Sequence, residues 1–165
     1  MKNFILSALL LASCSCGLTL SSGKGLDKTA VLVTSTGFGV TPAANWKRLP
    51  NVFPIPLPAP SYGDVTLYDK DTETMVFLST VDRLEDPTEI LLSLGNSDPD
   101  AKGSQVVNTP EIPDGLERSV ITDGSEFRVV FIPSKNKEFT HLIQSMIQKP
   151  EGKKLVSDLL KTFKQ

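Results

Sequence analysis

Residues 116–132 read Leu-Glu-Arg-Ser-Val-Ile-Thr-Asp-Gly-Ser-Glu-Phe-Arg-Val-Val-Phe-Ile, and this stretch decides the fold. The pair Asp123-Gly124 stands between two runs that are rich in β-branched and aromatic residues. A two-residue type I′ turn needs positive φ at both central residues, and Asp-Gly is one of the pairs that adopts it. The stretch therefore predicts an antiparallel hairpin made of residues 116–122 and 125–132.

A second hairpin is predicted upstream, from residues 64–68 and 75–80 on either side of a polar turn at 69–74. The turn carries Asp69, Asp71 and Glu73, but it lacks the central glycine and the distal glutamate of a calcium loop. We therefore expect a solvated turn. Shorter apolar runs at 29–34 and 105–109 predict two further strands, because both are rich in β-branched residues.

Two helices are indicated by their ends and by their apolar spacing. Asp86-Pro87-Thr88-Glu89 is typical of a helix start, with Asp86 as the N-cap and Pro87 at the first position. Gly95 is placed to end this helix, and we expect a polar loop at 96–103. After Pro150 one apolar face of a C-terminal helix is made by Leu155, Val156, Leu159, Leu160 and Phe163.

The stretch 139–147 is ambiguous. Its apolar residues follow the helical i, i+3, i+4, i+7 spacing, so periodicity alone favours a helix. The polar turn at 133–137 is short, however, and a third strand beside 125–132 would be equally economical in topology.

The chain begins with the features of an export signal. Lys2 supplies a positive charge, residues 4–12 form an apolar core, and Ala12-Ser13 are small. An apolar run this short cannot span a hydrocarbon layer that needs about 20 helical residues.

The stretch Leu11-Ala12-Ser13-Cys14 is similar to the bacterial lipoprotein box. The resemblance implies that Cys14 is lipidated and becomes the new amino terminus, with Cys16 as the alternative cysteine. An ordinary cleaved signal with two incidental cysteines is the other interpretation. Ser15 stands where this class of protein carries an aspartate for inner-membrane retention, so the resemblance favours the outer membrane if the cell has two.

These features divide the chain into a signal peptide at 1–13, a glycine- and serine-rich tether at 14–28 and one domain at 29–165. The formal charge of −2 offers no basic footprint for nucleic acid. Both cysteines lie in the signal region and the chain has one histidine, so we expect no disulfide in the domain, no metal site and no cofactor.

Candidate binding residues lie between the first strand and the first hairpin. Trp46 is interpreted as a core or rim anchor, with ligand stacking as the alternative. The segment 51–62 alternates proline with apolar residues, which makes it extended and excludes a central strand. It is either a stiff strap on the domain or a docking edge for a partner. The residues for such docking are Trp46, Pro54, Pro56, Pro58, Pro60 and Tyr62.

Little in the sequence points to catalysis. His141 is the only histidine and lies in an apolar stretch, where a neutral imidazole is expected. No Gly-x-Ser-x-Gly elbow is present, and the carboxylate pairs lie at helix starts and turns. We therefore predict that the chain is not an enzyme.

The order of elements resembles the PsbP/DcrB-like superfamily, which includes small exported lipoproteins. The likeness starts at Phe38-Gly39-Val40-Thr41-Pro42 with Trp46, and continues through Val106-Val107-Asn108 to the last helix, ending at 159–164. The proline segment is a departure from that plan. The resemblance implies an α+β fold in which helices pack on an antiparallel sheet, and it makes 139–147 a strand, which we adopt as the prediction.

Members of this superfamily are mostly accessory or binding proteins of membrane-associated assemblies. Together with the lipoprotein box, the resemblance implies a lipid-anchored binding protein of the cell envelope with an envelope protein as partner, at the periplasmic face of the outer membrane if the cell has two membranes. The alternatives are a periplasmic carrier of a small ligand or lipid and, less favoured, a hydrolase using His141.

Overall fold

The computed structural model of the chain describes residues 32–33, 38–49 and 61–165. The predicted signal peptide at 1–13, the predicted tether at 14–28 and the segment 50–60 lie outside these residues. The interpretations that involve Cys14, Cys16, Pro54, Pro56, Pro58 and Pro60 therefore fall on residues that are not described.

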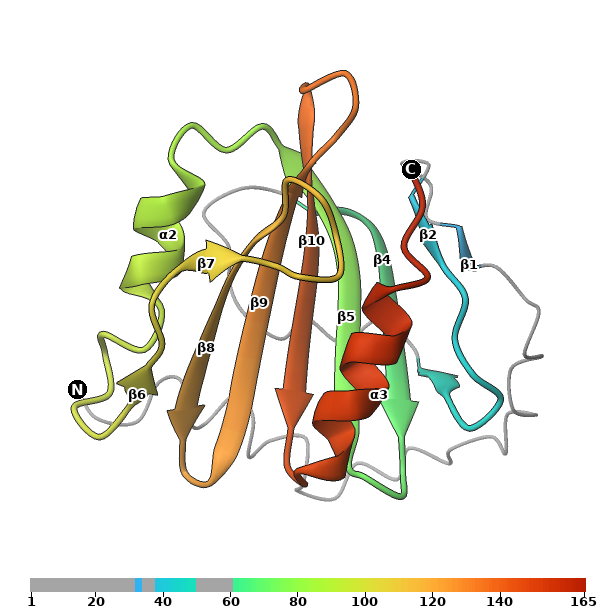
Figure 1. Ribbon diagram of the computed structural model, residues 1–165, viewed down its shortest axis with the longest axis vertical. Coiled ribbons are helices and arrows are strands. Elements are labelled where there is room, and N and C mark those ends of the chain that lie inside the picture. The colour runs from blue at the N-terminus through green and yellow to red at the C-terminus, as the bar shows by residue number, and fades with distance from the viewer. Residues whose placement is uncertain (1–31, 34–37, 50–60) are drawn as a thin grey trace.

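The fold is α+β, built on an eight-stranded sheet in which every pairing is antiparallel (Figure 1). In spatial order its strands are β3 (Lys47–Leu49), β4 (Ser61–Asp69), β5 (Thr74–Asp82), β10 (Phe139–Ile147), β9 (Ser125–Pro133), β8 (Leu116–Thr122) and β6 (Lys102–Gly103), and β7 (Val107–Asn108) also pairs with β8. A separate two-stranded sheet joins β1 (Leu32–Val33) to β2 (Gly39–Val40).

The predicted hairpin of β8 and β9 is confirmed. Thr122 faces Ser125 across a turn in which φ is 47° at Asp123 and 74° at Gly124. Positive φ at both residues is what a tight antiparallel connection requires, because it matches the right-handed twist of the strands.

The prediction that 139–147 is a strand is also confirmed, and the helix that periodicity favoured is wrong. β10 pairs along its length with β5 on one side and with β9 on the other. Leu142 packs with one hydrophobic cluster and Ile143 with the other, so both faces of this strand are buried. A strand that is apolar on both faces carries apolar residues at odd and even positions, and here they coincide with the helical spacing.

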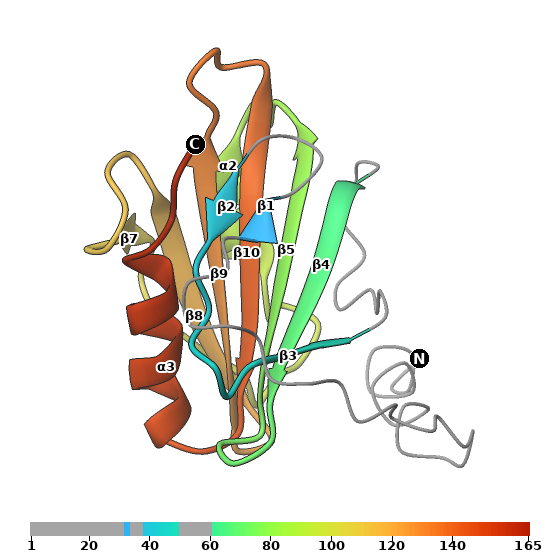
Figure 2. The same cartoon turned by 90° about the vertical axis from the view of Figure 1, so that its right-hand side faces the viewer.

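Two helices pack on opposite faces of the sheet (Figure 2). Helix α2 (Pro87–Ser93) places Leu91 against Val129, Phe131 and Leu142, and helix α3 (Glu151–Leu160) belongs to the other cluster. The predicted start of α2 is confirmed, because the side chain of Asp86 accepts a hydrogen bond of 3.0 Å from the Glu89 amide. Its end is confirmed by Gly95, which has a φ of 82°.

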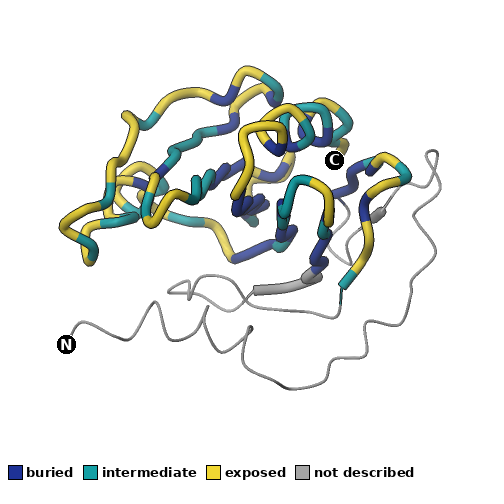
Figure 3. The backbone as a smooth tube through the Cα atoms, turned by 90° about the horizontal axis from the view of Figure 1, so that it is seen from below, coloured by how far each residue is buried: buried dark blue, intermediate teal, exposed yellow. Residues whose placement is uncertain are grey.

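The larger cluster lies between the sheet and α3. Val156, Leu159 and Leu160 are at most 3% exposed and pack there with Phe38 and residues from five strands, β2, β4, β5, β9 and β10. Gly152 lets the first turn of α3 approach the sheet, since a Cβ at this position would clash with the Thr74 hydroxyl. Figure 3 shows the buried segments gathered in the strands and along one side of α3, with exposed loops at the periphery.

The sequence predicted a solvated turn between β4 and β5, and the structure differs from this prediction at Asp69. Asp69 is 1% exposed rather than solvated. Its carboxylate accepts hydrogen bonds from the Asn45 amide (2.7 Å), the Thr72 backbone N–H (2.9 Å) and the Thr72 hydroxyl (2.6 Å). A buried carboxylate is stable only when its oxygens have such donors, and three are supplied here.

The remaining short strands differ in extent from the prediction. The expected loop at 96–103 ends in β6, and the strand expected at 105–109 is reduced to the two residues of β7. Both cover the outer edge of β8, where they leave fewer unpaired backbone groups. Of the strand expected at 29–34, Leu32–Val33 is described and forms β1.

Candidate binding site

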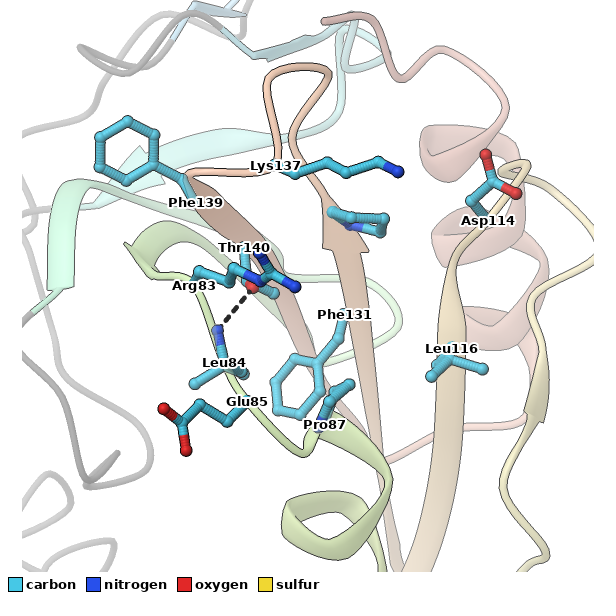
Figure 4. Close-up of a pocket in the computed structure, with 11 residues that line it drawn as sticks. Arg83, Leu84, Glu85, Pro87, Asp114, Leu116, Phe131, Lys137, Phe139 and Thr140 are labelled. Carbon is cyan, nitrogen blue, oxygen red and sulfur yellow. Dashed lines mark hydrogen bonds between the residues drawn. The ribbon is translucent and has the colours of Figure 1, made fainter.

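A pocket of about 270 Å³ lies at one end of the sheet, on the face that carries α2 (Figure 4). It is bounded by the segment that joins β5 to α2, by the start of β8, by the end of β9 and by the turn between β9 and β10. The lining residues are Arg83, Leu84, Glu85, Pro87, Asp114, Leu116, Phe131, Pro133, Lys137, Phe139 and Thr140.

The floor of the pocket is apolar. Leu116 and Phe131 face each other across the β8–β9 ladder, so their side chains share one face of the sheet. Pro87, the first residue of α2, forms a wall next to them, and all three are turned toward the centre of the pocket in Figure 4. Such a floor favours an apolar group over a solvated one.

The wall between β5 and α2 is held in place by backbone hydrogen bonds. The Arg83 N–H donates to the Glu138 carbonyl oxygen (3.0 Å), and the Leu84 N–H donates to the Thr140 hydroxyl (3.2 Å, the dashed line in Figure 4). The first bond ties this segment to the turn before β10, and the second ties it to β10 itself. The Arg83 side chain therefore projects from a fixed backbone.

Charged side chains stand around the apolar floor. In Figure 4 Arg83 and Lys137 reach over the pocket, Asp114 lies opposite Lys137, and Glu85 points outward at the rim. Within the described part of the chain, none of these four side chains forms an ion pair or a hydrogen bond. Their charges are available to a ligand.

Two of these charged residues are presented by tight turns. φ is 60° at Lys137 and 62° at Asp114, a region that non-glycine residues seldom occupy. The Lys137 turn is closed by the bonds from the Lys137 N–H to the Ser134 carbonyl oxygen (2.9 Å) and from the Phe139 N–H to the Ser134 hydroxyl (3.0 Å). Such bonds hold a strained backbone in place, so the ammonium group extends from a defined base.

The chemistry of the lining suits binding. The hydroxyl among the lining residues, that of Thr140, is buried and accepts the bond from Leu84. The lining residues include no histidine and no cysteine. What the pocket offers is an apolar recess with cations on one side and a carboxylate on the other.

The sequence-predicted binding residues do not line this pocket. Trp46 is 1% exposed and belongs to the cluster under α3, which confirms the interpretation as a core anchor and leaves almost no surface for a ligand to stack on. Tyr62 lies in β4 opposite Thr80. Neither residue belongs to the pocket.

The pocket residues were missed because they are far apart in sequence. Arg83 and Lys137 are brought together only by the pairing of Asp82 with Phe139 at the ends of β5 and β10. Their positions next to predicted strands could have indicated them. If 139–147 is a strand that pairs with 75–80, the residues that flank these two strands lie close together.

His141 lies in the core, away from the pocket. Its ring is 3% exposed, lies 4.6 Å from the Phe38 ring centroid, and has its Nδ1 3.0 Å from the Thr80 hydroxyl. Burial lowers the pKa of His141, because it disfavours the charged imidazolium. The ring is thus neutral near pH 7, and no substrate could reach it without opening the core.

Two further surveys concern the described residues alone. In the ranges 32–33, 38–49 and 61–165, no three histidine, cysteine, aspartate or glutamate residues are grouped so that they could hold a metal ion. No helix in that part of the chain has the length and apolar character needed to cross a bilayer.

The fold thus defines an α+β protein with a mostly antiparallel sheet and two described helices. No known protein family matches the sequence, and no curated protein matches it either.

Proposed function

We propose that the chain is a lipid-anchored accessory protein of the cell envelope, which binds a membrane-associated protein partner and catalyses no reaction. The observation that carries the proposal is the pocket, with its apolar floor and four charged side chains that have no partner in the described part of the chain. Ionised groups without a partner around an apolar recess favour recognition of another molecule.

A protein partner fits this pocket better than a carried small ligand. Pockets for small molecules commonly enclose about 300–1,000 Å³ and bury most of the ligand surface. The pocket here measures about 270 Å³ and stands open between the turn at 134–138 and the start of α2. A projecting group of a larger partner would fill such a recess while the rest of the partner covered its rim.

The sequence supports the proposed location in the cell envelope. The box at 11–14 is the basis for lipidation of Cys14, with Cys16 as the alternative. A lipoprotein cysteine carries several acyl chains, and more than one chain is needed for durable anchoring. Ser15 supports the outer membrane, at its periplasmic face, in a cell with two membranes.

The order of the strands and helices supports the proposed role as an accessory or binding protein. Phe38 to Trp46, two hairpins and a last helix in this order resemble the PsbP/DcrB-like superfamily, whose members are mostly accessory or binding proteins. A shared fold is a weak guide to function, so the pocket rather than the layout carries the proposal.

The hydrolase alternative is the least supported. Thr80 and His141 are a hydroxyl and an imidazole in contact, but they are 0% and 3% exposed and lie under Phe38. Nucleophilic catalysis needs a substrate carbonyl within reach of the hydroxyl.

The test is a mass measurement combined with crosslinking in membranes. Intact-mass analysis of the protein from membranes is expected to show a lipid-sized increment that Cys14→Ala removes and Cys16→Ala leaves in place. Crosslinking in the same membranes is expected to capture one envelope protein reproducibly with the wild type. A lipid-free wild type, or a chain that remains uncrosslinked, would contradict the proposal.

A further inference from the structure

We propose that the pocket binds the carboxyl terminus of its partner polypeptide, with an apolar last residue seated on the floor. This inference rests on the proposed function, in that the occupant is a protein, and it adds which part of that protein is recognised. Three features of the pocket carry it: two available cations, the apolar floor and the position of Asp114.

The cations call for an anionic group. Arg83 and Lys137 extend over the same recess from β5 and from the β9–β10 turn, and neither is paired with a described residue. A guanidinium binds a carboxylate through two parallel hydrogen bonds, and an ammonium adds a point charge beside it. A main-chain carboxylate matches this pair in charge and in size.

Arg128 differs from these two cations, because its charge is paired within the fold. The Arg128 guanidinium lies 2.8 Å from Glu111 and 2.5 Å from Glu117, and its charge is used within the fold. Arg83 and Lys137 have no such acids, although Glu85 and Asp114 stand close enough to line the same pocket. None of these four side chains forms an ion pair with a described residue.

The floor fits an apolar side chain on the residue that carries the carboxylate. In Figure 4 Phe131 and Pro87 lie below the two cations, and Leu116 lies beside them beneath Asp114. Burying a leucine- or phenylalanine-sized side chain there gains about 25 cal/mol for each Å² of apolar surface removed from water. The recess has room for about one large side chain with its backbone. The pocket would therefore recognise the last residue of the partner polypeptide.

Asp114 selects against other carboxylates. It stands opposite Lys137, on the far side of the recess from Arg83. Its oxygens can accept a backbone N–H of the bound peptide, while its charge repels an acidic side chain at the last position. A fatty acid also joins a carboxylate to an apolar body, but its chain would have to continue past Asp114 into solvent.

The experiment measures binding of defined peptides to the full chain, purified from membranes in detergent. Four fluorescein-labelled octapeptides with a Gly-Ser body and Val, Leu, Ile or Phe as the last residue are compared by fluorescence polarisation, each as the free acid and as the carboxamide. We expect at least one free acid to bind, and its carboxamide to bind at least about tenfold more weakly, because one charge-assisted contact is lost.

Variants locate the site. Arg83→Gln and Lys137→Gln are each expected to weaken binding of the free acid about tenfold and to abolish most of the difference between acid and amide. Lys70→Gln is the matched control: Lys70 is an exposed lysine in the turn at the opposite end of the sheet, and its loss should leave binding unchanged. Circular dichroism of each variant checks that the fold is intact.

Three outcomes would overturn the inference: no binding of any free acid to the wild type, equal binding of acid and amide, or equal loss in Lys70→Gln. Displacement of the peptide by sodium dodecanoate at lower concentration than by unlabelled peptide would assign the pocket to a lipid instead. These assays use no partner from the cell. A negative result would therefore contradict recognition of a carboxyl terminus, while the proposed function would still be tested by the crosslinking experiment.

Discussion

At the scale of single residues, Glu111 shows how the fold holds a buried carboxylate. Its side chain is 7% exposed and lies 2.8 Å from Arg128. Burial by itself raises the pKa of Glu111, but hydrogen bonds from Ser157, Arg128 and Thr109 and the charge of Arg128 outweigh it and lower the pKa to about 2. The loop that carries Glu111 is thereby tied to β9 and to α3.

This lowered pKa gives a pH dependence with a defined sign. The folded-state pKa of about 2 lies below the ordinary value of 4.5, so the unfolded chain binds the proton more readily. The contribution of Glu111 to stability is complete above about pH 5 and is lost as the pH falls toward 2. Urea unfolding at several pH values should show the free energy of unfolding of Glu111→Gln falling less than that of the wild type, by up to about 3 kcal/mol. Parallel curves for the two proteins would contradict the assignment.

Gln144 is a buried residue whose polar group is not satisfied. It is 5% exposed and lies in β10 between Phe77 and Val129, and its Oε1 has no hydrogen-bond partner among the residues that the structure describes. A buried acceptor without a donor costs about 1–3 kcal/mol.

Replacing this side chain should therefore stabilise the protein. We expect Gln144→Leu to raise the free energy of unfolding by about 1 kcal/mol, because the apolar side chain has similar volume and leaves no acceptor unpaired. The urea concentration at the midpoint of unfolding measures this change in stability. Gln144→Glu is the control and should lower the free energy of unfolding, because it buries a carboxylate between the same neighbours. A loss of stability in Gln144→Leu would mean that the oxygen has a donor after all.

At the scale of elements, Arg118 holds α2 to the edge of the sheet. Its Nη1 donates to the carbonyl oxygens of Leu91 (2.8 Å), Leu92 (2.6 Å) and Leu94 (3.0 Å), and its Nε donates to Ser104 (3.0 Å). The last carbonyls of a helix have no partner within it. Because α2 has only seven residues, this one side chain satisfies much of its C-terminal end.

Arg118→Lys should lower the free energy of unfolding by about 1–3 kcal/mol, since an ammonium cannot reach α2 and Ser104 together. Arg48→Lys, at an exposed arginine in β3, is the matched control and should have almost no effect. Gly103 gives a second check, because a Cβ at this position would clash with the Arg118 guanidinium. Gly103→Ala and Arg118→Lys should then cost less together than the sum of their separate costs, as measured by urea unfolding. Strict additivity would contradict the arrangement.

The elements that the sequence predicts well are those with local causes. The β8–β9 hairpin depends on Asp123-Gly124 and the start of α2 on Asp86 and Pro87, and both lie where they were expected. β10 could not be decided from periodicity, because its neighbours β5 and β9 bury both of its faces. The burial of Asp69 was missed for a related reason: its donor Asn45 is distant in sequence.

The candidate site was less predictable than the fold. Lys137 and Asp114 lie in turns that look like ordinary polar connections in the sequence, and Arg83 follows a strand without any motif. Their meeting depends on the order β5-β10-β9-β8, which places the residues next to both hairpins at one end of the sheet. The sequence offered Trp46 as a possible binding residue only as the alternative to a core anchor, and the fold uses it as core.

At the scale of the whole molecule, the first described strand and the pocket lie at the same end of the fold. β1 pairs with β2, and Gly39 of β2 pairs with Lys164 near the C-terminus (Figures 1 and 2). The next residue, Gln165, donates to the carbonyl oxygen of Pro133 (3.2 Å), and Pro133 lines the pocket. If Cys14 carries the lipid as proposed, we predict that this end of the sheet lies nearer the membrane.

This arrangement predicts that the length of the tether matters and its sequence does not. A flexible chain of about 14 residues reaches about 20 Å on average, and one of about six residues reaches roughly 13 Å. Deleting eight residues from 15–28 should therefore reduce crosslinking to the envelope partner, since the pocket would be pressed toward the headgroups. Replacing the same eight residues by glycine and serine should leave crosslinking unchanged, and the lipid-sized mass increment should persist in both variants. If the shortened and the substituted chains crosslink equally well, the partner does not depend on how far the pocket stands from the membrane surface.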